Sequence, residues 1–414
     1  MKSTSLFLLM CLVLMACSKD DETVTVQQCS KPTNGTAINI SDTSAQITWN
    51  DSNGVSNFTL EYGPTGFSLG SGTIVNSTNP LATLNNLAAN TTYDVYLKTT
   101  CTVDNVSMYS EVINFTTAAP MVIPQLLPNL SDLNLFVGNL ADLTPSSRAF
   151  EYNLNTPLFT DYAHKQRLIA LPPGTSLDYV DNDFPDFPDN TLISKTFFYF
   201  NDERNEALGK KIIETRILIK INGEWELGNY KWNAAQTDAV LDGNSHTVPV
   251  SFTNTAGATL SVNYGIPSMS QCIECHNNNN IITPIGPKLR TMNFNNQLQD
   301  FINAGYLTNL TNPDNVTTLP NWEDTSYTLE QRARAYFDVN CAHCHSDGGL
   351  CEIQSDLRLT YETPFAESMI LERSGSINNR MRNYNEGFSM PLTGTSMVHN
   401  EGYGLIRQYL SSLE

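Results

Sequence analysis

The chain has 414 residues, and 42 acidic side chains against 23 basic ones give it a formal net charge of −19 at pH 7. A chain of this length is expected to fold into about three domains. The acidic balance argues against a nucleic acid partner, because phosphate binding requires basic patches. No stretch beyond the N-terminal run is long and apolar enough to span a membrane.

The N-terminus indicates export. An apolar run from Leu6 to Ala16 follows Lys2; it is too short to cross a bilayer but fits the core of a signal peptide. Leu14 to Cys17 resembles a bacterial lipobox, which implies a signal peptide and lipobox over residues 1–17 and a lipid on Cys17. An ordinary secretory signal is the alternative.

The next segment, residues 18–27, is an acidic tether similar to those of lipoproteins on the outer surface of Gram-negative cells. This resemblance implies an exported outer-membrane lipoprotein that faces the cell surface, with a periplasm-facing protein as the alternative. We expect the lipid anchor to be its only contact with the membrane.

Residues 28–118 are expected to form an all-β antiparallel sandwich, because short alternating strands are separated by turns rich in Gly, Asn, Pro and Ser. Ser44–Trp49, Leu84–Tyr93 and Phe115–Ala118 resemble a fibronectin type III domain. The resemblance implies a spacer or adhesive module that contacts a glycan or a protein. The expected strands are Ala45–Trp49, Asn57–Tyr62, Thr92–Thr99 and Val112–Thr116.

A linker over residues 119–129 leads into a strand-rich middle domain over residues 130–270. Asn222-Gly223 between two strands is a strong hairpin signal. The clearest strands there are Phe197–Phe200, Glu214–Ile221 and Trp225–Trp232. The pattern then becomes mostly α-helical over residues 271–414, and the expected helices are Leu298–Ala304, Leu329–Val339 and Tyr403–Leu413.

Two strings of the form C-x-x-C-H lie in this last region, Cys272–His276 and Cys341–His345. This is the attachment signal for c-type haem. The two thiols add across the vinyl groups of one porphyrin, and the adjacent histidine binds the iron. The sequence therefore predicts two covalent haems, held by Cys272, Cys275, Cys341 and Cys344, with His276 and His345 as axial ligands.

A zinc site or a redox dithiol is the alternative for each string. The two pairs together would also supply four thiolates to one zinc ion. About 65 residues separate them, however, which exceeds the usual spacing of a compact zinc ribbon. A histidine directly after both pairs is required for haem attachment and not for zinc.

From residue 130 onwards the chain resembles an uncharacterised family of secreted bacterial dihaem c-type cytochrome-like proteins, some fused to sugar-dehydrogenase-like propellers or carbohydrate-binding modules. The resemblance brings no established reaction with it. It rests on Thr156–Lys165, Leu171–Gly174, Glu214–Arg216, Tyr230–Asn233, Gln236–Ala239, Pro284–Pro287 and the two haem strings.

The second string is similar to that of class I cytochromes c. Tyr336–Asn340 enters it as a short amphipathic helix, and Met390-Pro391 follows about 45 residues after His345, ahead of a closing helix. The resemblance implies that the Met390 sulfur binds the second iron and that the closing helix crosses the one before Cys341. Met381 and Met397 are weaker candidates, and Arg380 and Arg382 are candidates for contact with the haem propionates.

The first string has a less complete ligand set. Met292 is the candidate for the sixth iron position, against the alternative that it packs in the core. His164, His246 and His399 are alternatives for bis-histidine ligation, and an open sixth position is another. Of nine cysteines in all, Cys29 and Cys101 remain as a disulfide pair, which an exported protein allows, and Cys351 is left over.

The expected function is electron transfer at the cell surface, with a redox partner protein or an extracellular acceptor. Whether the chain is also an enzyme is left open. One alternative is a dihaem peroxidase-like enzyme, for which no distal acid–base pair is evident. The other is a surface lipoprotein that binds a glycan or a partner and carries an accessory haem region.

Overall fold

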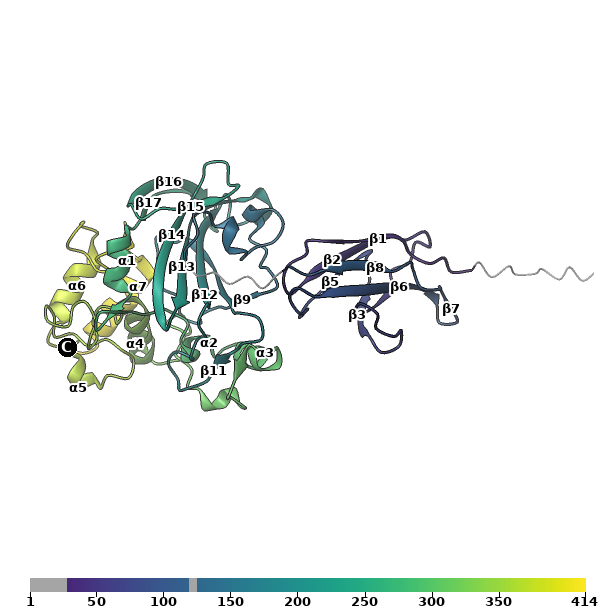
Figure 1. Cartoon of the computed structure of the whole chain (residues 1–414). Helices are drawn as coiled ribbons and strands as arrows, with labels where there is room; N and C mark the ends of the chain where they lie inside the picture. The colour runs from purple at the N-terminus through teal and green to yellow at the C-terminus, as the bar shows by residue number, and fades with distance from the viewer. Residues whose placement is uncertain (1–27, 119–124) are drawn as a thin grey trace, which may run out of the picture. The chain divides into compact units, whose positions relative to one another are not determined.

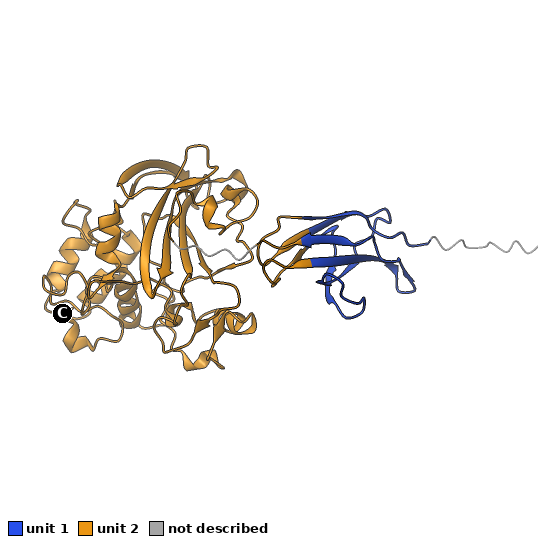
Figure 2. Cartoon of the chain, viewed as in Figure 1, with its two compact units in different colours: residues 1–37, 47–82, 93–115 blue, residues 38–46, 83–92, 116–414 orange. Residues whose placement is uncertain are grey.

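The computed structural model describes residues 28–118 and 125–414, so the expected lipid site at Cys17 lies outside the described residues. The chain divides into two compact units (Figure 2). Of the described residues, the first unit takes 28–37, 47–82 and 93–115, and the second takes 38–46, 83–92 and the remainder from 116.

Residues 28–118 form two antiparallel sheets, as their alternating pattern predicts. One sheet has the strand order β1-β2-β5; the other has the order β4-β3-β6-β7, with β8 paired to β6. Alternate residues such as Trp49, Leu60 and Leu97 are buried between them, and a disulfide joins Cys29 to Cys101 as expected. The strands are β1 (Thr33–Ile38), β2 (Ala45–Asn50), β3 (Phe58–Pro64), β4 (Thr73–Ser77), β5 (Leu81–Leu84), β6 (Thr92–Thr102), β7 (Asn105–Val106) and β8 (Ile113–Thr116).

A six-stranded antiparallel sheet of order β15-β14-β13-β12-β10-β9 forms the middle of the second unit (Figure 1). The Asn222-Gly223 turn joins β13 to β14, as predicted from this pair. The strands are β9 (Ala149–Glu151), β10 (His164–Ala170), β12 (Leu192–Phe200), β13 (Lys210–Ile221), β14 (Glu224–Trp232) and β15 (Ala239–Leu241), followed by a hairpin of β16 (His246–Thr253) and β17 (Thr259–Ile266).

Both faces of this sheet are covered, so its strands carry apolar residues at successive positions. Leu168, Leu192 and Ile217 pack on one face. Ile169 and Ile193 pack on the other, against the helices that follow. The middle and helical regions thus share one core.

The remaining elements hold the two C-x-x-C-H strings. In Figure 1 the helices after residue 328 gather on one side of the sheet. A parallel pairing of β11 (Leu177–Asp178) with β20 (Leu307–Thr308) also ties the middle region to the helical one. The helices are α1 (Met269–Cys275), α2 (Leu289–Met292), α3 (Gln297–Asn303), α4 (Leu329–Asn340), α5 (Phe365–Ser368), α6 (Ser374–Arg382) and α7 (Asn400–Ser411), with the short strands β18 (Asn277–Asn278) and β19 (Ile281–Ile282) after α1.

The expected helices overlap α3, α4 and α7, whereas α1, which carries the first cysteine pair, was not predicted. Within the described ranges, none of the helices combines the length and apolar character needed to cross a bilayer. The chain is therefore multidomain, with a β-sandwich, a strand-rich middle and a C-terminal part with several helices.

Candidate functional site

Helix α4 delivers the second cysteine pair. Thr328 starts the helix with a reciprocal capping box to Gln331, and the helix ends at Cys341. Helix α7 packs on α4 at Gly402, where an added Cβ would lie 2.4 Å from the Tyr336 ring. The closing helix therefore packs against the helix before the string, and only a glycine allows this close approach.

A cavity of about 770 Å³ opens beside the second string. It is lined by Cys341, Cys344, His345 and Met390 together, although Met390 is far along the chain. Sites for cofactors and drug-sized ligands usually have volumes of about 300–1,000 Å³. The residues present therefore fit a haem c at this position. Its other lining residues include Phe337, Leu359, Ile377, Met381, Arg373 and Arg380.

Hydrogen bonds hold residues 389–394, which we call the methionine loop, against α6. The Met390 N–H donates to the Arg380 carbonyl oxygen over 3.0 Å, and the Arg380 guanidinium donates to the Phe388 carbonyl oxygen over 3.0 Å. The Ser389 hydroxyl donates to the Asn383 carbonyl oxygen over 2.7 Å. These bonds fix the backbone that presents the Met390 thioether to the cavity.

Hydrogen bonds of its backbone position His345. Its N–H donates to the Cys341 carbonyl oxygen over 3.0 Å, and its carbonyl oxygen accepts from Leu359 over 2.8 Å. Its buried Nδ1 has no hydrogen-bond partner among the described residues. Burial first, and then the neighbouring charges of His343, Arg358 and Arg380, lower the pKa of His345 and favour the neutral, ligating form.

Helix α1 delivers the first cysteine pair, and Ser268 starts it with a capping box to Gln271. His276 lies just past its end, and its Nδ1 is 2.8 Å from the Thr283 carbonyl oxygen. A carbonyl oxygen only accepts, so Nδ1 carries the proton and Nε2 keeps the lone pair that a metal requires. Burial lowers the pKa of His276 to about 4.

The space beside the first string is much smaller. The cavity lined by Cys272, Cys275 and His276 has a volume of about 80 Å³. A neighbouring cavity of about 450 Å³ shares Leu158, Lys195, Cys275, Ile285 and His343 with it. The smaller cavity alone does not fit a haem, so a haem at this string would also have to occupy the adjoining cavity, which is lined by Cys275 but not by Cys272 or His276.

The two strings meet at their second cysteines. Ligand atoms of Cys275, His343 and Cys344 all lie within 4.8 Å of one another. The Cys344 thiol donates to the Cys275 sulfur, which lowers the pKa of Cys275 and raises that of Cys344. The Thr393 hydroxyl lies 3.3 Å from the Cys275 sulfur. The methionine loop thus reaches the first string as well.

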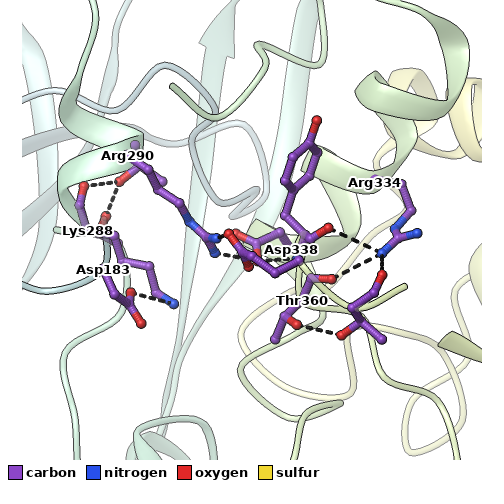
Figure 3. A network of polar contacts seen from close by, with 11 residues as sticks. Asp183, Lys288, Arg290, Arg334, Asp338 and Thr360 are labelled. Atoms are coloured by element: carbon purple, nitrogen blue, oxygen red, sulfur yellow. Dashed lines mark hydrogen bonds and ion pairs between the residues drawn. The ribbon is translucent and has the colours of Figure 1, made fainter. Parts of the chain in front are cut away.

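A buried polar network fixes α4 against the segment that follows the first string (Figure 3). Arg290 of α2 donates to Asp338 of α4 over 2.8 Å and also pairs with Glu362, and each of the first two side chains is only 5% exposed. The Tyr361 N–H donates to Asp338 over 3.0 Å. Arg334, also on α4, donates to the carbonyl oxygens of Thr360, Tyr361 and Thr363. The network thus fixes the helix before the second C-x-x-C-H string against the segment after the first.

Met390 lies beside the second string, whereas Met292 lies away from the first. Met292 is fully buried in the core, among apolar side chains such as Leu289 and Phe301. It does not line the cavity at His276. Ligation by Met292 stays a prediction, and its surroundings match the alternative of core packing.

The three alternative histidines have other partners. His164 lies 3.3 Å from Glu203, and His246 lies 2.7 Å from Asp242. His399 stacks on the Phe159 ring, with centroids 4.1 Å apart, and its Nδ1 lies 3.0 Å from the Tyr336 hydroxyl.

Sequence reasoning missed His343, an intervening residue of the second string, as a neighbour of Cys275. It also missed a row of cations beside the first string. The alternation of Lys165 and Arg167 with an intervening polar residue was a signal for the second feature, because such spacing puts both on one face of a strand. Cys351 lines the cavity of the second string.

Comparison with known families identifies residues 30–116 as a fibronectin type III domain. Solved structures align over the same share of the chain. A structure titled "Myokine structure" is 21% identical, covers 22% of this chain and 97% of its own, and has a TM-score of 0.19. The FN1–FN3 domains of chicken CNTN1 are 19% identical, with 22% and 30% coverage and a TM-score of 0.20.

The FN5 domain of Drosophila Lar is 15% identical over 22% of this chain and 97% of its own, with a TM-score of 0.19. A search of curated proteins found no match. The first domain is thus established as fibronectin type III. The matched family model covers none of the expected cytochrome c-like region.

Proposed function

We propose that the second unit is a dihaem c-type cytochrome that transfers electrons. The observation that carries the proposal is the cavity of about 770 Å³ that is lined by Cys341, Cys344, His345 and Met390 together. These are the two thioether positions and the two axial ligands that a haem c requires. When bound, haem supplies a one-electron redox centre.

The protein's own contribution is to hold ligands and exclude water. Hydrogen bonds to α6 hold the Met390 loop, and burial keeps His345 neutral. At the first string, the bond to Thr283 fixes the tautomer of His276 that leaves Nε2 available. Met269 and His343 also line the cavity at the first string and are the candidates for its sixth ligand.

The meeting of Cys275 with Cys344 favours electron exchange between the centres. Thioether positions this close would attach two porphyrins side by side. The anchor on Cys17, the surface location and a role of the fibronectin type III domain in contacting a glycan or protein belong to the same proposal. An acidic exterior would attract a basic redox partner.

A zinc site is the second candidate, because one cluster of the described residues has metal-ligand composition. Cys275, His343 and Cys344 converge, and Cys351 lies on the adjacent cavity wall. A structural zinc ion usually takes four such ligands. Zinc would leave His276, His345 and Met390 without a role.

The test is expression of the exported chain with haem-maturation enzymes, followed by mass and visible spectra. We expect two covalent haems in the native chain and one in each paired variant, Cys272→Ala/Cys275→Ala and Cys341→Ala/Cys344→Ala. Cys351→Ala is the matched control and should keep both. A colourless protein that contains zinc, and loses it in Cys351→Ala, would refute the cytochrome proposal and support the second candidate.

A further inference from the structure

Three neighbouring strands place cations directly opposite one another. Arg167 on β10 pairs in register with Lys195 on β12, and Lys195 pairs with Arg216 on β13. Residues in register point to the same face, with Cβ atoms about 4.5–5.5 Å apart. Lys165 precedes Arg167 by two positions and therefore shares that face. We call Lys165, Arg167, Lys195 and Arg216 the cationic row.

The row lies over one aromatic ring. The Lys165 and Lys195 ammonium groups are 5.9 Å and 5.6 Å from the centre of the Phe197 ring, and the Arg216 guanidinium is 4.5 Å from it. Phe197 is fully buried. The ring face attracts cations weakly, but it carries no net charge and cannot neutralise them.

Acidic groups near the row are fewer than its cations. Glu214 is fully buried and accepts from Arg216 and from the Tyr264 hydroxyl. Asp161 is close to Lys165 but accepts three hydrogen bonds from Ser396.

The third acid, Glu151, is close to Arg167 but exposed to solvent. Like charges placed directly opposite across a sheet are destabilising, and so is a buried charge without a partner. The row therefore lacks counter-charge.

Two further observations point to a missing anion. Arg167 is only 5% exposed, and the buried Nε atoms of Arg167 and Arg216 have no hydrogen-bond partner in the described part of the chain. Burial, followed by the charges of Arg167, Lys165 and Arg216, lowers the pKa of Lys195 well below its ordinary value. A bound anion would restore the charged amine and supply acceptors.

The row opens on the first haem string. Lys195 and Arg216 line the cavity of about 80 Å³ together with Cys272 and His276. This volume exceeds the roughly 30 Å³ that one water occupies in the liquid, so a small oxyanion or a single carboxylate group has room there. The cavity is too small for a larger organic ligand.

We propose that Lys195 and Arg216, backed by Lys165 and Arg167, form an anion-binding site at the first string. Its ligand is an oxyanion, and two sources supply that chemistry: a propionate of a haem attached at Cys272 and Cys275, or a small free oxyanion. The first source rests on the proposed cytochrome function, whereas the second does not.

The experiment uses the full exported chain and the variant Lys195→Gln. Lys210→Gln is the matched control, because Lys210 lies on the same sheet with its ammonium 5.1 Å from the Phe198 ring, which faces the other way. Lys195→Arg keeps the charge. Lys165→Gln, at the start of the row on β10, serves as the second variant if Lys195→Gln fails to fold.

The first arm titrates inorganic phosphate and follows the thermal midpoint. A free oxyanion site predicts a rise in the native chain and in Lys210→Gln. The same rise in Lys195→Gln should need at least about 10-fold more phosphate, since a charge-assisted hydrogen bond is lost.

The second arm measures the reduction potentials. A propionate at the row predicts no phosphate response. Loss of a nearby positive charge should shift the first haem to lower potential in Lys195→Gln, with recovery in Lys195→Arg.

The proposal is overturned if phosphate raises all midpoints equally or not at all and the potentials of Lys195→Gln match the native chain. A chain that carries no haem refutes the cytochrome function but leaves the phosphate arm decisive for the anion site.

Discussion

The two C-x-x-C-H strings share a local pattern and have very different surroundings. The second follows a long helix and opens on a wide cavity that a methionine also lines. The first has both of its cysteines within a short helix, faces a sheet and opens on a small cavity beside buried cations. In the proposed cytochrome, the string would specify attachment alone, whereas the elements packed around it would set the sixth ligand, the local charge and the access of solvent.

The largest loss of stability is expected from breaking the Arg290–Asp338 pair, which joins α4 to the segment after the first string. Asp338→Asn leaves the buried Arg290 with only Glu362 for charge compensation. We expect a loss of about 3 kcal/mol, in the range for breaking a buried ion pair. Urea unfolding measures it. Asp183→Asn is the control: it removes a half-exposed partner of Lys288 and should cost less than about 1 kcal/mol. Equal losses in the two variants would contradict a stabilising role of the Arg290–Asp338 pair.

Substitutions of Met390 and Met292 distinguish the two strings most directly. Met390→Ala should convert one haem from low spin to high spin, since its sulfur lines the cavity with His345. Met292→Ala should leave the spectrum unchanged and cost roughly 2–5 kcal/mol, because its side chain fills the core. A spectral change in Met292→Ala would instead identify Met292 as the sixth ligand of the haem at the first string.

The packing of α7 on α4 sharpens the account of the second region. Gly402→Ala places a methyl group against Tyr336 and should cost about 1–3 kcal/mol by overpacking. Gly404→Ala adds a methyl group to the same helix where nothing lies within 4 Å. It should be neutral or stabilising by up to about 1 kcal/mol. Thermal unfolding compares the pair, and similar midpoints would argue against the close contact.

A smaller, pH-dependent effect comes from His399. Burial lowers its pKa from 6.5 to about 4. The unfolded chain therefore binds the proton more tightly, and the stabilising contribution is complete above pH 6.5 and lost as the pH falls towards 4. The full shift corresponds to about 3 kcal/mol, which partial exposure of the ring reduces to about 2 kcal/mol, measured by urea unfolding. His399→Gln should flatten this dependence; a slope that survives would assign it to other groups.

Much of the fold follows from short-range sequence. Alternating residues, the Asn222-Gly223 turn and the 3.6-residue periodicity predicted strands and helices that the structure contains, because these patterns reflect local backbone preferences and burial on one face. Helix α1 escaped prediction because its seven residues are too few for a periodic signal. The fibronectin type III domain was predicted from three segments and is confirmed.

The sequence by itself determined the chemistry available: two pairs of thiols with adjoining histidines, a disulfide pair and an acidic chain. Only the tertiary structure decided the neighbours. It placed Cys275 beside Cys344, Met390 in a cavity and Met292 in the core, and it aligned Arg167, Lys195 and Arg216 across three strands. Such contacts join residues far apart in the chain, and they depend on strand register and helix packing, which no local pattern encodes.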